Sequence, residues 1–212
     1  MTCTANSGLF THSHLTFEMK QTTEATVLGL KKHSDKMSVL HVYSRSEGRL
    51  ALSVYGAYGK HKLRAAYQPL SVVELTYDSQ PARSFAVLSS IDPIYLPEQV
   101  YSDIRRQSVA LFVAEMLMLT FTHPLREEHV YQFLNDFVHE LNCTSEPENL
   151  HISFLIRLAE LLGIGVPEVV QPTPSSRGER QKQLRQLCDY YCQEIESFRM
   201  PKSLDILIEV FD

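Results

Sequence analysis

The sequence predicts an α+β protein in which a small five-stranded β-barrel precedes an all-helical domain. Five short runs that alternate apolar and polar residues follow one another between residues 24 and 91. From about residue 98 onwards, apolar residues recur instead at helical spacing. Alternation with a period of two is typical of half-buried strands, whereas the longer spacing is typical of amphipathic helices. With 212 residues and 44% hydrophobic content, the chain can bury a core in one or two domains.

The domain boundaries are predicted from changes in composition. Residues 1–18 are polar and without periodicity, so we expect a disordered N-terminal arm. The barrel is expected over residues 19–97, closed by the segment DPIYLP with its two prolines, and the helical domain over residues 98–212. The start of the chain lacks the pattern of a signal peptide, and the four cysteines lack a disulfide-scaffold spacing. Together these observations predict a reducing, cytoplasmic setting.

The strands of the barrel are predicted at residues 24–30, 37–43, 50–57, 70–77 and 84–91. Between the second and third strands, Gly48 occupies a turn position that requires a positive backbone angle, which predicts a hairpin. Alternate apolar residues of the third and fourth strands are expected inside the barrel. These residues are Leu50, Leu52, Val54, Val73, Leu75 and Tyr77.

Helices are predicted at residues 108–121, 127–141, 147–162 and 203–211, with a further helix around residues 184–195. The first of them is apolar nearly all round, which indicates a core helix, and it is too short to cross a membrane. Ser145 and Ser203 are the expected N-caps of the third and last helices. Residues 165–180 hold three prolines and no periodicity, so a long proline-rich loop is expected there.

The charge of the chain is unevenly distributed. Residues 29–64 hold eight Lys or Arg against two acids, a net of +6, whereas the remainder holds 12 basic and 23 acidic residues. The overall net charge of −5 therefore conceals a basic barrel. A basic field of this kind favours a polyanionic partner, and tyrosines beside a basic loop suit single-strand binding. The alternative interpretation is an ordinary solvated face, with the tyrosines packed on the barrel.

No catalytic constellation is found. The chain has no phosphate-binding G-x-x-x-x-G-K-S/T loop, no G-x-S-x-G elbow and no H-E-x-x-H helix. Cys188 and Cys192 are spaced to lie one turn apart on a helix, but no further ligands lie nearby in the sequence, so packing is favoured over a metal site. These observations predict a binding protein without a cofactor, not an enzyme.

The barrel region resembles the N-terminal barrel of RecO, the family of bacterial recombination mediators. Short motifs occur here in the order and spacing typical of that family. They are Glu24, Ala25, Val27 and Leu28; Ser34 and Asp35; Glu47 and Gly48; Gly56 and Ala57; the basic loop 60–64; Gln68, Pro69 and Leu70; and Glu74 and Leu75. The C-terminal run KSLDILIEVF is similar to the closing motif of the family.

This resemblance implies an OB-fold barrel that binds single-stranded and duplex DNA without sequence preference. It also implies annealing of strands coated with single-strand-binding protein, and loading of RecA together with RecR in DNA repair at the nucleoid. The predicted DNA contacts are Lys31, Lys32, Arg45, Arg49, Lys60, Lys62, Arg64 and Tyr58.

The resemblance also implies a contact with the acidic tail of single-strand-binding protein, which ends in phenylalanine. Such a ligand needs an apolar pocket with a cation at its rim. The helical-domain candidates for that cation are Arg105, Arg106, Arg126 and Arg157. Many family members carry a four-cysteine zinc module where this chain has only the proline-rich loop, so no metal is expected.

Two other functions stay open on the sequence. One is an RNA-binding OB module, because charge and stacking serve both nucleic acids alike. The other is a non-catalytic adaptor whose basic loop meets an acidic protein. Competition between DNA and RNA oligomers would distinguish the RNA-binding module from a DNA-binding protein. The salt dependence of nucleic-acid binding would distinguish the adaptor, because a true phosphate binder loses affinity steeply as salt increases.

Overall fold

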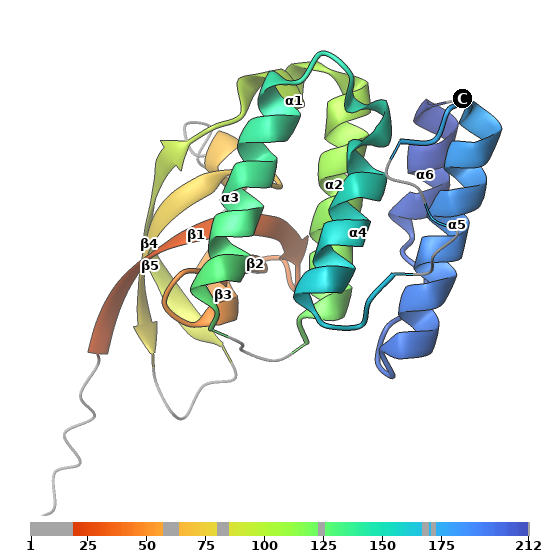
Figure 1. Cartoon of the computed structure of the whole chain (residues 1–212). Coiled ribbons are helices and arrows are strands. Elements are labelled where there is room, and N and C mark those ends of the chain that lie inside the picture. Colours follow the sequence, from red (N-terminus) through yellow and green to blue (C-terminus); the bar gives the residue numbers. More distant parts are fainter. Residues whose placement is uncertain are drawn as a thin grey trace, which may run out of the picture.

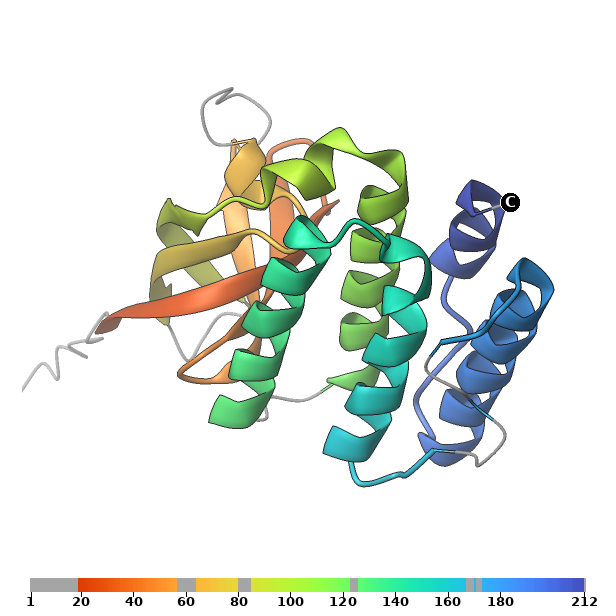
Figure 2. The ribbon, with the colours of Figure 1, turned by 45° about the horizontal axis from the view of Figure 1, so that its top comes forward.

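The computed structural model describes residues 19–56, 64–79, 85–122, 126–166, 170 and 173–211. Five strands lie on one side of the molecule and the helices pack beside them (Figures 1 and 2). The strands are β1 (Met19–Lys32), β2 (Met37–Ser44), β3 (Gly48–Tyr55), β4 (Val72–Ser79) and β5 (Ala86–Tyr95). The α-helices are α1 (Glu98–Ser102), α2 (Ile104–Thr120), α3 (Glu128–Cys143), α4 (Leu150–Leu161), α5 (Arg177–Glu194) and α6 (Ser203–Val210), with short 3₁₀ helices η3 (Ala65–Tyr67) and η4 (Pro147–Asn149).

The strands form a closed barrel in the order β1-β2-β3-β5-β4. Neighbouring strands are antiparallel except for a short parallel pairing that closes the barrel, in which Leu52 and Ser53 of β3 pair with Ala86 and Val87 of β5. The predicted five-stranded OB-type barrel followed by helices is therefore confirmed. The hairpin is confirmed too, because Gly48 has a φ of +73° and pairs with Ser44.

The inside of the barrel is an apolar core of its own. The residues predicted to face inwards do so: five of them are buried and Leu50 is half-buried against them. Val27, Leu40 and Val42 of β1 and β2 belong to the same core.

A bulge in β1 joins the barrel to the helices. The pairing of β1 with β2 shifts between Val27 and Gly29, so the residue between them, Leu28, faces outwards. Leu28 then belongs to the second core, which the helices form. Tyr43 of β2 joins the same core, and its ring centroid lies 5.2 Å from that of Phe121. The barrel and the helices therefore share buried surface on this outer face of β1 and β2.

The strand ends differ from the prediction. The pairing with β4 carries β1 back to Met19, and β5 continues through Pro93 to Tyr95 instead of ending near residue 91. The register of β4 and β5 shifts between Val72 and Val73, which leaves Ile94 without a partner in the pairing. Proline is tolerated at such a bulge because its missing N–H breaks no ladder hydrogen bond there.

The helical caps differ from the prediction as well. Asp103 caps α2 by accepting hydrogen bonds from the N–H groups of Arg105 and Arg106, so this helix begins four residues earlier than expected. Ser145 is not a cap, because η4 precedes α4 and neither has a side-chain cap. Ser203 is not the N-cap of α6 but its first residue.

The expected proline-rich loop is shorter than residues 165–180, because α5 begins at Arg177. Three hydrogen bonds at the start of α5 explain this. The hydroxyl oxygen of Ser176 accepts from the N–H of Glu179, and the Glu179 carboxylate accepts from the N–H and hydroxyl of Ser175. This reciprocal arrangement is close to a capping box, which starts a helix. Within the described ranges, no helix combines the length and the apolar character needed to cross a membrane.

Candidate nucleic-acid interface

A cleft of about 920 Å³ opens where the barrel meets α2 and α6. Its walls come from the end of β1, the start of β3, the segment around η3, one face of α2 and the start of α6. Four cations line it: Lys31, Arg49, Arg64 and Lys202. Three of them, all but Lys202, are among the predicted DNA contacts. The fold thus gathers cations from both ends of the chain.

Arg49 has no acidic partner among the described residues. One guanidinium nitrogen donates to the backbone carbonyl of Leu50 at 3.3 Å, and another lies 3.2 Å from Nδ1 of His41. The buried Nε has no hydrogen-bond partner, and no carboxylate in the described part of the chain lies within ion-pair distance of Arg49. Burial lowers the pKa of Arg49 to about 10, so the side chain is still charged at neutral pH.

His41 on β2 is the side-chain partner of Arg49, and its imidazole is neutral. Burial, with the charges of Arg49 and Lys31, lowers the pKa of His41 to about 4. The imidazole is therefore neutral at pH 7, and its Nδ1 can accept a hydrogen bond from Arg49. A neutral acceptor leaves the positive charge of Arg49 uncompensated, which suits the binding of an anion.

Glu115 of α2 is the carboxylate of the cleft, and its hydrogen bonds fix the start of α6. It accepts from the backbone N–H of Lys202 at 3.0 Å, from that of Ser203 at 2.8 Å and from the Ser203 hydroxyl at 2.6 Å. Burial favours a raised pKa for Glu115, but these hydrogen bonds and the charge of Lys31 outweigh it and lower the pKa. Glu115 is therefore ionised, and its carboxylate is already hydrogen-bonded to the start of α6. Four cations line the same cleft.

The cleft also has an apolar wall. Leu111 of α2 and Ile206 of α6 both line it, with 45% and 53% of their surfaces exposed. Met118 and Leu119 continue this wall along α2. The cleft therefore offers charge on one part of its surface and exposed aliphatic groups on another.

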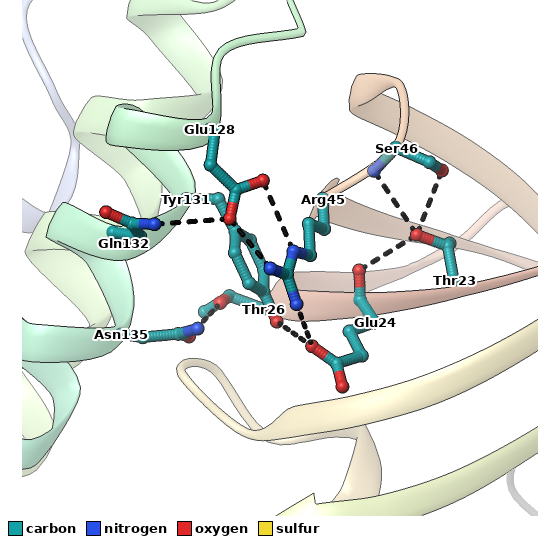
Figure 3. A network of polar contacts seen from close by, with 9 residues as sticks. All are labelled: Thr23, Glu24, Thr26, Arg45, Ser46, Glu128, Tyr131, Gln132 and Asn135. Atoms are coloured by element: carbon teal, nitrogen blue, oxygen red, sulfur yellow. Dashed lines mark hydrogen bonds and ion pairs between the residues drawn. The ribbon is translucent and has the colours of Figure 1, made fainter.

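Arg45, another predicted DNA contact, lies outside this cleft and is fully engaged (Figure 3). Its guanidinium nitrogens lie 3.3 Å from Glu24 and 3.0 Å from Glu128. Its guanidinium carbon lies 5.9 Å from the ring centroid of Tyr131. Arg45 thus ties the β2–β3 turn to α3, next to a hydrogen bond of 3.1 Å from Thr26 to Asn135.

Of the remaining predicted contacts, only Lys32 belongs to the described residues. Lys32 is exposed and pairs with Asp35 at 2.9 Å. Tyr58, Lys60 and Lys62 lie outside the described residues, as does the expected arm of residues 1–18.

Three of the four arginines predicted to bind a partner already have contacts within the molecule. Arg105 pairs with Glu148 at 3.2 Å, and Arg106 donates to the backbone carbonyl of Thr144. Arg157 pairs with Glu140 at 3.3 Å. Arg126 is exposed just before α3. None of the four lines the cleft described above.

Two important residues of the cleft were not predicted from the sequence as site residues, Lys202 and Glu115. A signal for Glu115 exists: it is the one acidic residue in the apolar segment 108–121. The role of Glu115 cannot be predicted from that segment alone, because the groups it binds are at the start of α6, far along the sequence. As for metals, no three His, Cys, Asp or Glu side chains in the described ranges gather closely enough to hold an ion.

Comparisons with known proteins now add to this geometry. The family described as "Recombination protein O N terminal" matches residues 19–97, and "Recombination protein O C terminal" matches residues 101–168. A protein named DNA repair protein RecO from Porphyromonas gingivalis is 26% identical over 90% of this chain and 98% of its own length. The protein of the same name from Flavobacterium johnsoniae is 24% identical over 91% of this chain and 100% of its own length.

Proposed function

Because this chain belongs to the RecO family of DNA repair proteins, we propose that it is a non-catalytic recombination mediator that binds DNA at the cleft between barrel and helices. The observation that carries this proposal is the set of four cations, Lys31, Arg49, Arg64 and Lys202, which face one cleft around a single engaged carboxylate. Lys60, Lys62 and Tyr58, which lie outside the described residues, stay part of the proposal as predicted DNA contacts.

The proposed mechanism is electrostatic. Cations that neutralise phosphates release condensed counterions, and this release favours binding most strongly at low salt. With part of their charge neutralised, two complementary strands approach closely enough to pair. Phosphates carry no sequence information, so single strands and duplexes would bind without sequence preference.

The proposed partners follow from the family. The protein would anneal strands coated with single-strand-binding protein and act with RecR to load RecA at the nucleoid. Docking of the acidic tail of single-strand-binding protein on the helical part remains a proposal, with Arg126 as the candidate that forms no ion pair within the described ranges. Arg105, Arg106 and Arg157 would have to give up intramolecular contacts to take part.

Annealing provides the test. Two complementary oligonucleotides coated with cognate single-strand-binding protein are mixed without ATP, with and without the protein, and duplex formation is followed by fluorescence. The proposal expects faster annealing with the parent protein and a loss of this acceleration in the Lys31→Gln, Arg49→Gln double variant. A Lys182→Gln, Arg199→Gln double variant is the matched control, because it removes the same charge from two exposed residues outside the cleft.

Two results would contradict the proposal. No acceleration with the parent protein would rule out strand annealing. Stronger competition by an RNA oligomer than by the same DNA sequence would favour the RNA-binding module instead.

A further inference from the structure

The last helix of the described chain belongs to the cleft, although it lies outside both regions matched by the family, which end at residue 168. Lys202, Ser203 and Ile206 all line the cleft beside β1 and α2. The inward face of α6 packs into the helical core through Leu204 and Leu207, which are buried. On its cleft side, Ile206 is exposed.

The position of Lys202 is fixed by hydrogen bonds from its own backbone and its neighbour. The Glu115 carboxylate holds the N–H groups of Lys202 and Ser203 and the Ser203 hydroxyl. These N–H groups are the unpaired donors at the start of a helix, so a carboxylate from α2 serves as the cap of α6. Only the backbone of Lys202 is engaged within the described residues, so its ammonium group is available to a ligand.

Ile206 is unusual in that it is exposed beside four cations. Single exposed aliphatic residues are common on protein surfaces and need no explanation. Here, however, Ile206 and Leu111 come from two different helices and line the same cleft. A ligand made of phosphate alone gains nothing from such a wall. A ligand with both phosphates and apolar faces gains from both parts of the cleft.

We propose that α6 completes a site for an unpaired DNA strand, in which Lys202 contacts a phosphate and Ile206, with Leu111, contacts a base. In a duplex the bases are stacked and paired, whereas an unpaired strand exposes its base faces to apolar side chains. The volume of about 920 Å³ lies within the range of about 300–1,000 Å³ that encloses a compact ligand, which suits roughly one or two nucleotides. This inference rests on the proposed DNA binding and adds to it a preference for single strands.

The test measures the binding of a labelled oligothymidylate and of a duplex of equal length by four single variants of the full chain. Lys202→Gln and Ile206→Ser alter the cleft. Their matched controls are Lys182→Gln on α5, an exposed lysine outside the cleft, and Ile104→Ser on α2, where the isoleucine is 64% exposed outside the cleft.

The two cleft variants have different expected signatures. Lys202→Gln is expected to weaken single-strand binding several-fold and to reduce the slope of log K against log salt by about 0.7, the loss of one phosphate contact. Ile206→Ser is expected to weaken oligothymidylate binding several-fold with an unchanged salt slope and unchanged duplex binding. A strand carrying 2-aminopurine should also change its fluorescence less with this variant, because a base is no longer covered.

The outcomes separate the two proposals. If the parent protein binds neither oligonucleotide, the proposed function itself fails. If the parent binds single strands but both α6 variants match their controls, DNA binding stands and the role of α6 is overturned. If Ile206→Ser weakens the binding of an acidic peptide with an apolar end but not that of DNA, the cleft serves a protein partner and the inference is also overturned.

Discussion

Arg45 and Arg49 belong to one hairpin, four residues apart in the sequence, yet their surroundings are opposite. Arg45 pairs with Glu24 and Glu128 and lies over the ring of Tyr131, so its charge is used within the molecule. Arg49 has only a carbonyl and a neutral imidazole as partners in the described chain. The difference shows that a count of basic residues overstates a binding surface, because some cations hold the fold together and others remain available to a ligand.

The largest effect is expected when the cations available in the cleft are removed together. A Lys31→Gln, Arg49→Gln, Arg64→Gln triple variant should bind single-stranded DNA at least about tenfold more weakly at low salt, with the slope of log K against log salt reduced by about 2. The matched control, Arg45→Gln, Arg105→Gln, Arg157→Gln, removes the same charge from cations that are already paired. Fluorescence anisotropy titrations at several salt concentrations measure both. Equal losses in the two variants would mean that only net charge matters.

His151 of α4 extends the comparison to a polar side chain that is enclosed in the helical core. Neither ring nitrogen has a hydrogen-bond partner among the described residues, and the ring packs between Phe112 and Phe211. Burial, with the charge of Arg180, lowers the pKa of His151 from 6.5 to about 3. Between these pH values the unfolded chain binds a proton that the folded chain does not, so stability falls as the pH falls.

His151→Phe should remove this part of the acid sensitivity. In the parent protein it amounts to about 1.4 kcal/mol of unfolding free energy per pH unit below pH 6.5. Urea unfolding between pH 7 and pH 5 measures it, and the variant should show a shallower dependence on pH. Parallel curves for the two proteins would show that His151 is protonated in the fold.

A smaller effect reports directly on the unpaired charge of Arg49. Burial is the main reason for the low pKa of His41, and Arg49 is the next. Arg49→Gln should therefore raise the pKa of His41 from about 4 while leaving it below the usual 6.5. Adding oligothymidylate to the parent protein should shift it in the same direction, because a phosphate offsets the charge of Arg49. Both shifts are followed by NMR titration, and an unmoved His41 in both experiments would mean that the guanidinium is neutralised by another group.

The smallest effect is expected for Arg45→Gln. This variant loses two exposed ion pairs and a ring contact, so its melting temperature should decrease slightly at low salt and less at high salt, where surface charges are screened. Its affinity for DNA should stay close to that of the parent. A loss of affinity as large as that of Arg49→Gln would remove the distinction between the two arginines.

The fold was largely predictable, because it depends on patterns that are local in the sequence. Alternation located the strands, Gly48 located the hairpin, and helical spacing located α2 and α3. The sequence did not indicate where the elements begin and end. A bulge carries β5 through Pro93, and the hydrogen bonds of Ser175 and Ser176 with Glu179 start α5 at Arg177. Those ends depend on register and capping, which short patterns do not specify.

The candidate site was predictable only in part. The charge count pointed to Lys31, Arg49 and Arg64, but it could not separate them from Arg45, because the pairing with Glu128 joins positions 83 residues apart. Lys202 was missed for the same reason, since its cleft neighbours belong to β1 and α2. Contacts of this range depend on how the barrel sits against the helices, and no local pattern reports that.

The contact between Glu115 and the start of α6 has a consequence for the order in which the molecule matures. During synthesis the N-terminal part of a chain generally folds first, and the barrel contains its own core. Glu115 emerges well before Lys202 and Ser203, so until then its carboxylate has none of the three donors that engage it in the finished protein. A nascent chain would thus hold a folded barrel beside an incomplete cleft, and a truncation before residue 202 would leave the protein in that immature state.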